Sequence, residues 1–326
     1  MRRLAIINQK GGVGKTTTTA NLGAALSRAG LRVLLVDLDP QAHLTLYFGV
    51  EVGDGQFSVY DDLTADAPVA QAVLELRDGM VLLPASIDLA GAEAELISVT
   101  GREMILRDSL ARWGREFDVM LIDCPPALGV LTINALVAAD EVLIPLQAHF
   151  FALQGLGKLL DTVSLVRKRI HPRLVVNGIV LCLHESATKL ASEVVADIQR
   201  FLASSKDSHA AWNQARLYQS CIRRNIKLAE SASYGQTVFE YALRSNGALD
   251  YAHLAAEVFE VSSERILMQP EDKVDPEAAS RPGGSRLSKE NAALERMEIG
   301  QVSAEAVSLE PSPTLMPTPA PIVGIR

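Results

Sequence analysis

The sequence predicts an α/β fold: a doubly wound, mostly parallel β-sheet followed by a disordered C-terminal tail. Apolar runs that end in glycine, proline or aspartate alternate with segments of helical spacing over residues 1–261. The apolar runs are continuous rather than alternating, which is typical of strands covered by helices on both faces of a sheet. Because ligands bind at the carboxyl ends of such strands, the residues after each run are the first candidates for function.

The expected strands and helices follow one another within a single domain, residues 1–261. The first helix is expected to stop at Gly30. The apolar runs predict strands at 4–7, 32–36, 80–83, 118–122, 141–144 and 174–183. The helical spacing predicts helices at 16–29, 104–113, 128–138, 153–170, 190–203 and 249–261.

Residues 262–326 are expected to form a disordered, proline-rich, acidic tail. Residues 270–326 hold eight of the fifteen prolines, and the last aromatic residue of the chain is Phe259. Without aromatic side chains such a segment buries too little apolar area to offset the entropy lost on ordering. Truncation after Ser263 is therefore expected to leave stability nearly unchanged.

Composition narrows the class of protein. Of the 326 residues, 48% are hydrophobic and 21% charged, as in soluble globular proteins. The net charge of −8 excludes a uniformly basic nucleic-acid coat but not a local basic patch. Three scattered cysteines exclude a disulfide scaffold and indicate a reducing compartment. No apolar run approaches the roughly 18 residues of a membrane span, so we expect a cytoplasmic protein with no membrane partner.

The sharpest signal is a glycine-rich segment, KGGVGKTT, between the first strand and the first helix. Such a turn points backbone N–H groups at phosphate oxygens, and the helix N-terminus adds partial positive charge. We expect Lys15 to reach the β- and γ-phosphates of a nucleotide and the Thr16 hydroxyl to bind Mg²⁺. A standard P-loop has glycine where this chain has Gln9, beside a second lysine, Lys10, so the loop is a variant. The expected nucleotide-binding residues are Gly11, Gly12, Val13, Gly14, Lys15, Thr16 and Thr17.

Carboxylates follow two further strands. Asp39 comes after the run that ends at residue 36, and Asp123 follows the run 118–122. A carboxylate beside a P-loop suits an outer-shell ligand of Mg²⁺, and a second can orient or deprotonate an attacking water. We therefore expect Thr16, Asp39 and Asp123 to hold Mg²⁺, the carboxylates through water.

These segments resemble a known family. Residues 8–17, 36–41 and 123–135 resemble the nucleotide motifs of ParA-type (Soj-like) chromosome and plasmid partitioning ATPases. These ATPases form part of the deviant-Walker (SIMIBI) P-loop group, with MinD and the nitrogenase iron protein. Residues 222–230 resemble the C-terminal motif of the family, so the resemblance spans about residues 1–260.

The resemblance implies a mechanism and partners. Lys10 would be the signature lysine that crosses an ATP-sandwich homodimer to the partner's phosphates. Lys10, Lys15, Asp39 and Asp123 would then be the catalytic residues, with Asp39 positioning the water and Asp123 as the Walker B carboxylate. Asn225 would contact adenine. Such dimers bind duplex DNA nonspecifically in the ATP state, and a ParB-type protein stimulates hydrolysis, which places them on the nucleoid.

A basic group within the C-terminal motif is the candidate DNA surface. It consists of Arg223, Arg224 and Lys227, and Arg223 stands where the family usually has proline. Clustered Lys and Arg bind phosphate backbones without reading bases. No aromatic platform for single strands is interleaved with them, which favours duplex DNA.

Three other interpretations compete with DNA partition. An iron–sulfur redox protein would need cysteines at a two-fold axis. Cys124 instead follows the strand 118–122 and Cys182 lies within the strand 174–183, so both are better explained by packing. A MinD-like spatial regulator would need a basic amphipathic C-terminal helix, which the acidic tail does not provide. The same ATPase could instead position a protein cargo on the nucleoid, and the sequence does not separate this from DNA partition.

Overall fold

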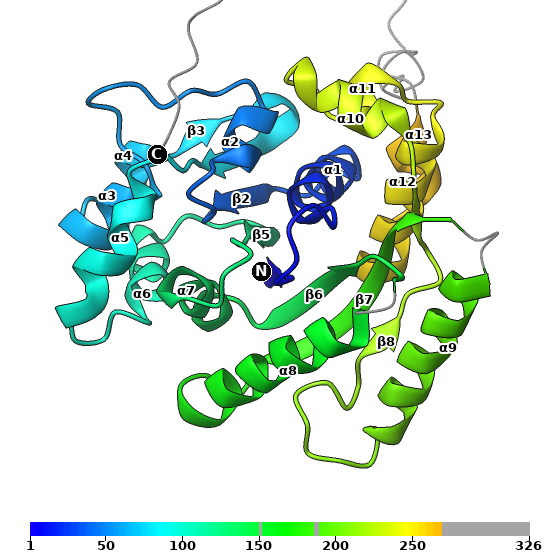
Figure 1. Ribbon diagram of the computed structural model, residues 1–326. Coiled ribbons are helices and arrows are strands. Elements are labelled where there is room, and N and C mark those ends of the chain that lie inside the picture. Colours follow the sequence, from blue (N-terminus) through cyan, green and yellow to red (C-terminus); the bar gives the residue numbers. More distant parts are fainter. Residues whose placement is uncertain (150–151, 186–188, 269–326) are drawn as a thin grey trace, which may run out of the picture. The chain divides into compact units, whose positions relative to one another are not determined.

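A nine-stranded sheet forms the centre of the molecule in the part of the chain that the structure, a computed structural model, describes: residues 1–149, 152–185 and 189–268. The strand order is β3-β4-β2-β5-β1-β6-β7-β8 (Figure 1). Strand β9 also pairs with β7, closer to the carboxyl end of β7 than β8 does. Only β3 runs antiparallel to its neighbour. The strands are β1 (Arg2–Ile6), β2 (Val33–Asp37), β3 (Leu74–Glu75), β4 (Met80–Leu83), β5 (Val119–Asp123), β6 (Glu141–Leu146), β7 (Val175–His184), β8 (Arg216–Leu217) and β9 (Ile222–Arg223).

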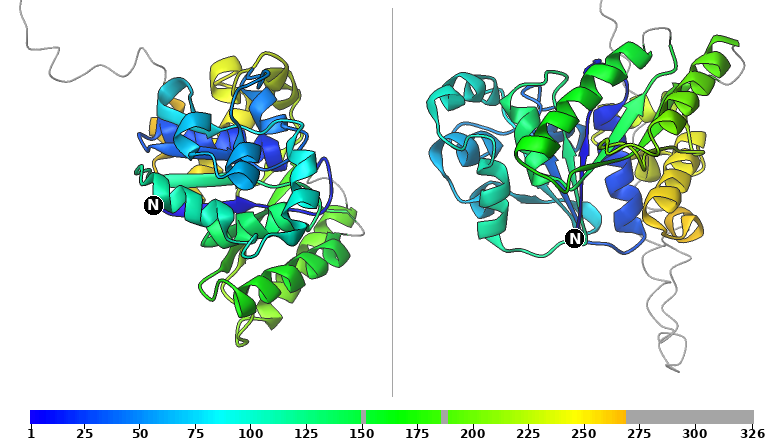
Figure 2. Two further views of the ribbon diagram at one scale, coloured as in Figure 1. Left: turned by 90° about the vertical axis from the view of Figure 1, so that its left-hand side faces the viewer. Right: turned by 90° about the horizontal axis from the view of Figure 1, so that it is seen from below.

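Helices cover both faces of this sheet (Figure 2). No helix among the described residues is long and apolar enough to cross a membrane. The α-helices are α1 (Lys15–Arg28), α2 (His43–Tyr47), α3 (Val59–Ala65), α4 (Val69–Ala72), α5 (Leu89–Glu95), α6 (Ile105–Trp113), α7 (Val130–Ala138), α8 (Ala152–Arg169), α9 (Lys189–Ser204), α10 (Ile226–Ser233), α11 (Val238–Tyr241), α12 (Asn246–Phe259) and α13 (Ser263–Leu267). Two 3₁₀ helices, η1 (Arg77–Gly79) and η2 (Leu96–Ser98), flank β4 and α5.

Two hydrophobic cores lie on opposite faces of the sheet. Along β1 and the residue after it, Leu4 and Ile6 pack with α1 and α12, whereas Ala5 and Ile7 pack with α6 to α9. All four side chains are fully buried. Because both faces of the central strands are covered, their inner stretches 4–6, 33–36, 119–122 and 142–144 are apolar throughout, which explains the continuous apolar runs.

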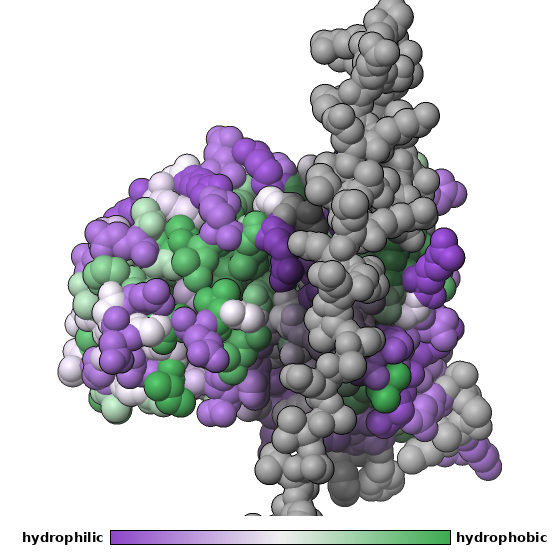
Figure 3. Space-filling model, turned by 90° about the horizontal axis from the view of Figure 1, so that it is seen from above, coloured by the Kyte–Doolittle hydropathy of each residue, from purple (hydrophilic) through white to green (hydrophobic). Residues whose placement is uncertain are grey.

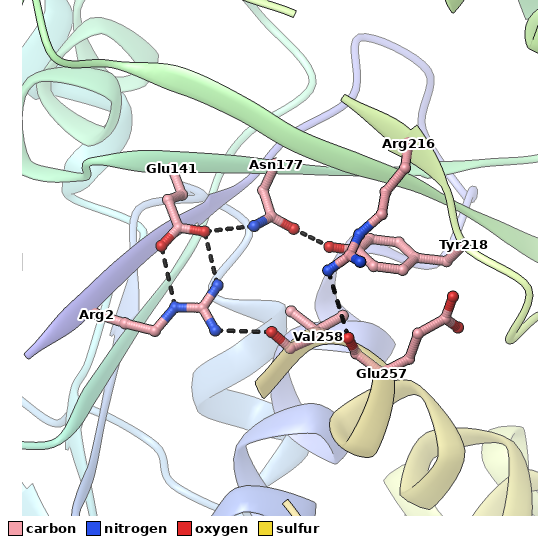
Figure 4. A network of polar contacts seen from close by, with 7 residues as sticks. All are labelled: Arg2, Glu141, Asn177, Arg216, Tyr218, Glu257 and Val258. Carbon is pink, nitrogen blue, oxygen red and sulfur yellow. Dashed lines mark hydrogen bonds and ion pairs between the residues drawn. The ribbon is translucent and has the colours of Figure 1, made fainter. Parts of the chain in front are cut away.

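A polar network ties the amino ends of the strands to α12 (Figure 4). Arg2 donates to both carboxylate oxygens of Glu141, at 3.0 and 2.7 Å, and to the carbonyl of Val258 at 2.7 Å. Asn177 donates to Glu141 and accepts from the Tyr218 hydroxyl. The network joins β1, β6, β7 and the segment after β8 at the sheet edge opposite the strand ends where a ligand is expected.

The predicted fold class is confirmed. All six predicted strands form, as β1, β2, β4, β5, β6 and β7, and the six predicted helices form as α1, α6, α7, α8, α9 and α12. The elements not predicted are short, such as α2, α10 and the two-residue strands β8 and β9. Elements of two to eight residues show too few turns or alternations to establish a period.

The folded body extends past the predicted boundary at residue 261. Ser262 caps α13 by accepting from the Arg265 N–H, and the Ile266 side chain is fully buried against α1 and α12. Arg28 on α1 donates to the carbonyl of Ile266 at 2.7 Å. The expectation of disorder from residue 262 is therefore wrong for 262–268, because one isoleucine and one arginine suffice to dock a five-residue helix. Residues 269–326 lie outside the described residues.

Ile266→Ala should lower the free energy of unfolding by about 2 kcal/mol, because it empties a buried aliphatic site. Urea denaturation followed by circular dichroism measures this. Leu165→Ala, at a half-exposed site on α8, is the matched control and should change stability by less than about 0.5 kcal/mol. Equal stability of the two variants would mean that α13 is not docked in solution.

Candidate active site

A cleft of about 640 Å³ opens at the carboxyl ends of the central strands and is lined by residues of α1, α2 and α10. Figure 1 shows where these three helices lie relative to the sheet. Its volume lies within the usual range for small-molecule sites. Its walls come from the glycine-rich loop, the segment after β2, and one side of α10. The main lining residues are Gly11, Gly12, Gly14, Lys15, Thr16, Thr17, Asp39, Gln41, His43, Tyr47, Leu228, Ala229, Ala232 and Ser233.

The glycine-rich loop leads directly into α1. Gly12 and Gly14 have φ values of +73° and +95°, which favour glycine, and Gly14 forms the N-cap of α1. The first turn of α1 therefore faces the cleft, a geometry that favours phosphate groups. Lys15 lines the cleft and is only 7% exposed. Of the predicted loop residues, all but Val13 line the cleft. The Val13 side chain is buried and lines a hollow on the other side of the loop.

Two buried carboxylates stand side by side behind this loop. Asp37 ends β2 and Asp123 ends β5, and the two are direct partners in the parallel register. Burial and the neighbouring Asp37 raise the pKa of Asp123, whereas Lys15 lowers it. The pair therefore creates a position where a cation is strongly favoured.

The predicted metal ligands do come together. The Thr16 hydroxyl donates to Asp123 at 2.6 Å, and Asp39 lines the same cleft. Among the described residues no group of three or more histidine, cysteine or carboxylate side chains could enclose a metal. One hydroxyl and one or two carboxylates suit Mg²⁺, which in nucleotide sites takes its other ligands from water and phosphate. The residues present thus fit a magnesium–nucleotide complex.

Asp37 holds the loop that carries Asp39. One Asp37 oxygen accepts from the Asp39 N–H at 3.1 Å, and the other accepts from the Thr45 N–H and hydroxyl at 2.9 and 2.7 Å. The Thr45 hydroxyl oxygen in turn accepts from the Ala85 N–H at 3.0 Å. Sequence reasoning missed this positioning role, since nothing in the sequence pairs Asp37 with a threonine eight residues later.

A second buried chain of hydrogen bonds fixes the helices around the cleft. Asn21 on α1 donates to the Tyr47 hydroxyl at 2.9 Å, and that hydroxyl lies 3.1 Å from the Ser231 hydroxyl on α10. Asn21 also accepts from the Val238 N–H at 2.8 Å. The helix after the phosphate loop is therefore connected directly to α2, α10 and α11, contacts that no local motif indicates.

Asn225, the predicted adenine contact, is placed at the N-cap of α10. Its side-chain oxygen accepts from the Lys227 N–H at 2.9 Å, and Asn225 is not among the residues that line the cleft. The next turns of α10 line it instead, through Leu228 and Ala229 and then Ala232 and Ser233. The spacing of these four residues places them on one side of a helix and could have indicated that they line the cleft. It was not used, because α10 was not predicted as a helix.

Lys10 lies outside the cleft. It is exposed and belongs to the hollow on the other side of the loop, with His149 and Lys158. Its backbone N–H donates to the Asn8 side chain at 3.0 Å. The structure therefore does not direct Lys10 at the nucleotide cleft of its own chain.

The three basic residues of the predicted DNA surface each have an acidic partner. Arg223 is bound by Asp250, whose side chain is 6% exposed, and so fastens β9 to α12. Arg224 pairs with Glu185 at 2.7 Å, and Lys227 pairs with Glu230 at 2.8 Å. Exposed pairs such as these contribute little and can exchange partners. Arg223 therefore has a role in the fold, whereas Arg224 and Lys227 are held only by exposed ion pairs.

The buried cysteines are packing residues. Cys124 and Cys182 are free thiols within the two cores, and the Cys182 sulfur lies 3.8 Å from the Thr18 hydroxyl on α1. Burial raises the pKa of Cys182 to about 12, so its thiol stays protonated.

Comparisons with known proteins agree with this geometry. A sequence profile of the AAA domain family matches residues 1–176. The chain is 42% identical to the sporulation initiation inhibitor protein Soj of Bacillus subtilis over 256 residues, covering 78% of this chain and 97% of Soj. It is 41% identical to the chromosome partitioning protein ParA of Caulobacter vibrioides over 268 residues, covering 81% and 96%.

Solved structures share the fold. The ATP complex of a Cyanothece McdA variant superposes with a TM-score of 0.70 at 25% identity, covering 80% of this chain and 97% of McdA. A Mycobacterium smegmatis protein described as cobyrinic acid a,c-diamide synthase, with bound ATP analogue and magnesium, superposes with a TM-score of 0.62. That protein is 40% identical, over 72% of this chain and 93% of its own. Sequence, fold and site geometry together show that the chain belongs to the ParA-type partitioning ATPases of the MinD/ParA P-loop family.

Proposed function

We propose that this protein is a DNA-partitioning ATPase that dimerises around ATP, binds duplex DNA nonspecifically in that state, and hydrolyses ATP when a ParB-type partner binds. The observation that carries the proposal is the group formed by buried Lys15, half-buried Thr16 and buried Asp123 at a nucleotide-sized cleft. Acting on the nucleoid of the cytoplasm, such a cycle would segregate a chromosome or a plasmid.

ATP and Mg²⁺ are the cofactors that fit this group. The M. smegmatis relative is described with an ATP analogue and magnesium, and the McdA relative with ATP. Mg²⁺, when bound, would neutralise charge on the phosphate oxygens. Thr16 and Asp123 would hold it, Lys15 would pair with the phosphates, and Asp39 would orient the attacking water through the oxygen not occupied by the Gln41 N–H.

Lys15→Ala should abolish tight ATP binding, because the phosphates lose their principal buried cation. Asp39→Ala should keep ATP affinity within about threefold but lower turnover by about 100-fold or more, in the range for a lost general base. Fluorescent-ATP titration and phosphate release measure the two effects. Glu116→Ala, an exposed acid before β5, is the matched control. Normal turnover by Asp39→Ala would contradict the role proposed for it.

Dimerisation is proposed because the second lysine, Lys10, does not line the nucleotide cleft of its own chain. Lys10 is exposed beside the phosphate loop, and Gly11 next to it has open space where a side chain would begin. Two loops that approach each other across a shared nucleotide would place Lys10 near the partner's phosphates. The added positive charge would then arrive only on dimerisation.

Gly11→Val should bind ATP but remain monomeric. A side chain at this position meets nothing within 4 Å in the protomer, so the variant should fold, and only an approaching partner loop would collide with it. Light scattering with and without ATP tests this, with Gly157→Val on α8, also open but not lining the hollow beside Lys10, as the control. If Gly11→Val dimerises as the wild type does, the sandwich arrangement is wrong for this protein.

DNA binding is proposed to use Arg224 and Lys227, which are the exposed cations at the start of α10. The Asn21–Tyr47–Ser231 chain joins α10 to the helix after the phosphate loop, so nucleotide and DNA would act on one set of helices. Dimerisation would present the two patches together, and binding through both would be much stronger than through one.

Arg224→Glu with Lys227→Glu should abolish plasmid binding in ATP while ATP-driven dimerisation persists. Because phosphate contacts release counterions, wild-type binding should fall steeply with salt and show little sequence preference. Filter binding at two salt concentrations measures both properties. Arg200→Glu with Lys206→Glu, at and after α9, makes the same charge change elsewhere and is the control. If wild-type protein with ATP fails to bind DNA at low salt, a protein cargo replaces DNA in the proposal.

A further inference from the structure

A second hollow, of about 650 Å³, lies beside the nucleotide cleft and shares Gln41 and Leu46 with it, but the function proposed above does not use it. It is bounded by the segment 40–42 that follows Asp39, by the loop 50–57, and by residues 85–88 after β4. We call it the α2–α3 groove. Three large apolar side chains line it with unusual exposure: Leu46 is 47%, Phe57 42% and Ile87 69% exposed. Figure 3 views the face that carries α2 and β3, where apolar side chains gather between hydrophilic ones.

The rim of the α2–α3 groove is acidic. Its nineteen lining residues, all described, include Glu51, Asp54, Asp61 and Asp88 but no lysine or arginine. Glu51 and Asp54 are exposed on the loop between α2 and α3. An exposed apolar floor with a rim of one charge sign is typical of a surface that binds another chain.

We propose that the α2–α3 groove docks a segment of the activating partner protein in which apolar side chains stand next to lysine or arginine. The apolar side chains would cover Leu46, Phe57 and Ile87, and the cations would pair with the acidic rim. A second copy of this chain is the alternative occupant, and a change in the dimerisation constant of groove variants would reveal it. The inference rests on the proposed function in one respect, the existence of a ParB-type activator.

The groove touches the catalytic loop. Its wall includes Thr45 and Ala85, and the Thr45 hydroxyl both donates to Asp37 and accepts from the Ala85 N–H. Asp37 in turn holds the Asp39 N–H. A segment that settles against this wall therefore presses on the residues that hold Asp39, which gives docking a direct route to the rate of hydrolysis.

The test compares two groove variants with wild type in ATPase titrations with the purified ParB-type protein of the same genome. Glu51→Lys with Asp54→Lys reverses the rim, and Ile87→Ser removes apolar surface; neither variant alters the nucleotide site. Each variant should keep the basal rate and should raise the ParB concentration for half-maximal stimulation by about tenfold or more. Glu116→Lys with Asp207→Lys, both exposed elsewhere, is the matched charge control and should behave as wild type.

A photo-crosslinking residue at position 87 identifies the occupant directly. The crosslinked ParB peptide should contain apolar residues beside lysine or arginine. The inference is overturned if both groove variants are stimulated at the same ParB concentration as wild type. It is also overturned if the charge control loses ParB sensitivity to the same extent, or if the variants change the dimerisation constant and not the response to ParB. If ParB-type protein does not stimulate the wild type at all, the activator in the proposed function is wrong and the inference falls with it.

Discussion

The buried pair of Asp37 and Asp123 is the constraint on which the rest of the site depends. Two carboxylates placed side by side at the ends of β2 and β5, with no exposure to water, repel each other and are costly to ionise. The surrounding structure stabilises the two carboxylates in different ways. Asp37 is surrounded by N–H and hydroxyl donors, whereas Asp123 faces Thr16 and the Lys15 ammonium. Asp37 thus holds the surrounding backbone in place, whereas Asp123 remains able to bind a cation.

The geometry of the cleft follows from this division. Satisfying Asp37 requires the chain after β2 to turn back, which places Asp39 at the cleft and begins α2. Tyr47 at the end of α2 then meets Asn21 and Ser231, so α10 is drawn against the phosphate-loop helix. A short series of buried hydrogen bonds therefore connects α1, the loop that carries Asp39, and α10. Buried polar groups of this kind are worth much more when every member is paired.

Sequence reasoning predicted the parts of the site that are contiguous in the chain. The glycine-rich loop, Lys15 and Thr16 lie in eight residues, and Asp123 ends a plain apolar run, so both could be recognised without knowing the fold. Contacts between distant segments could not be predicted. Neither the ion pair of Arg223 with Asp250 nor the docking of Ile266 on α1 leaves a local pattern, so the sequence indicated neither the contact of Arg223 nor the helix beyond residue 261. The helix α10 was missed for a related reason: eight residues that face a cleft on one side do not show the apolar stripe of a core helix.

The central claim is that the Asp37 network positions Asp39, and Thr45→Val tests it most directly. Valine keeps the shape of threonine but removes the hydroxyl that donates to Asp37 and accepts from Ala85. Single-turnover phosphate release should fall by about tenfold, because even a small displacement of a catalytic group is costly, whereas fluorescent-ATP affinity should stay within about twofold. A wild-type rate in a correctly folded Thr45→Val protein would contradict the account.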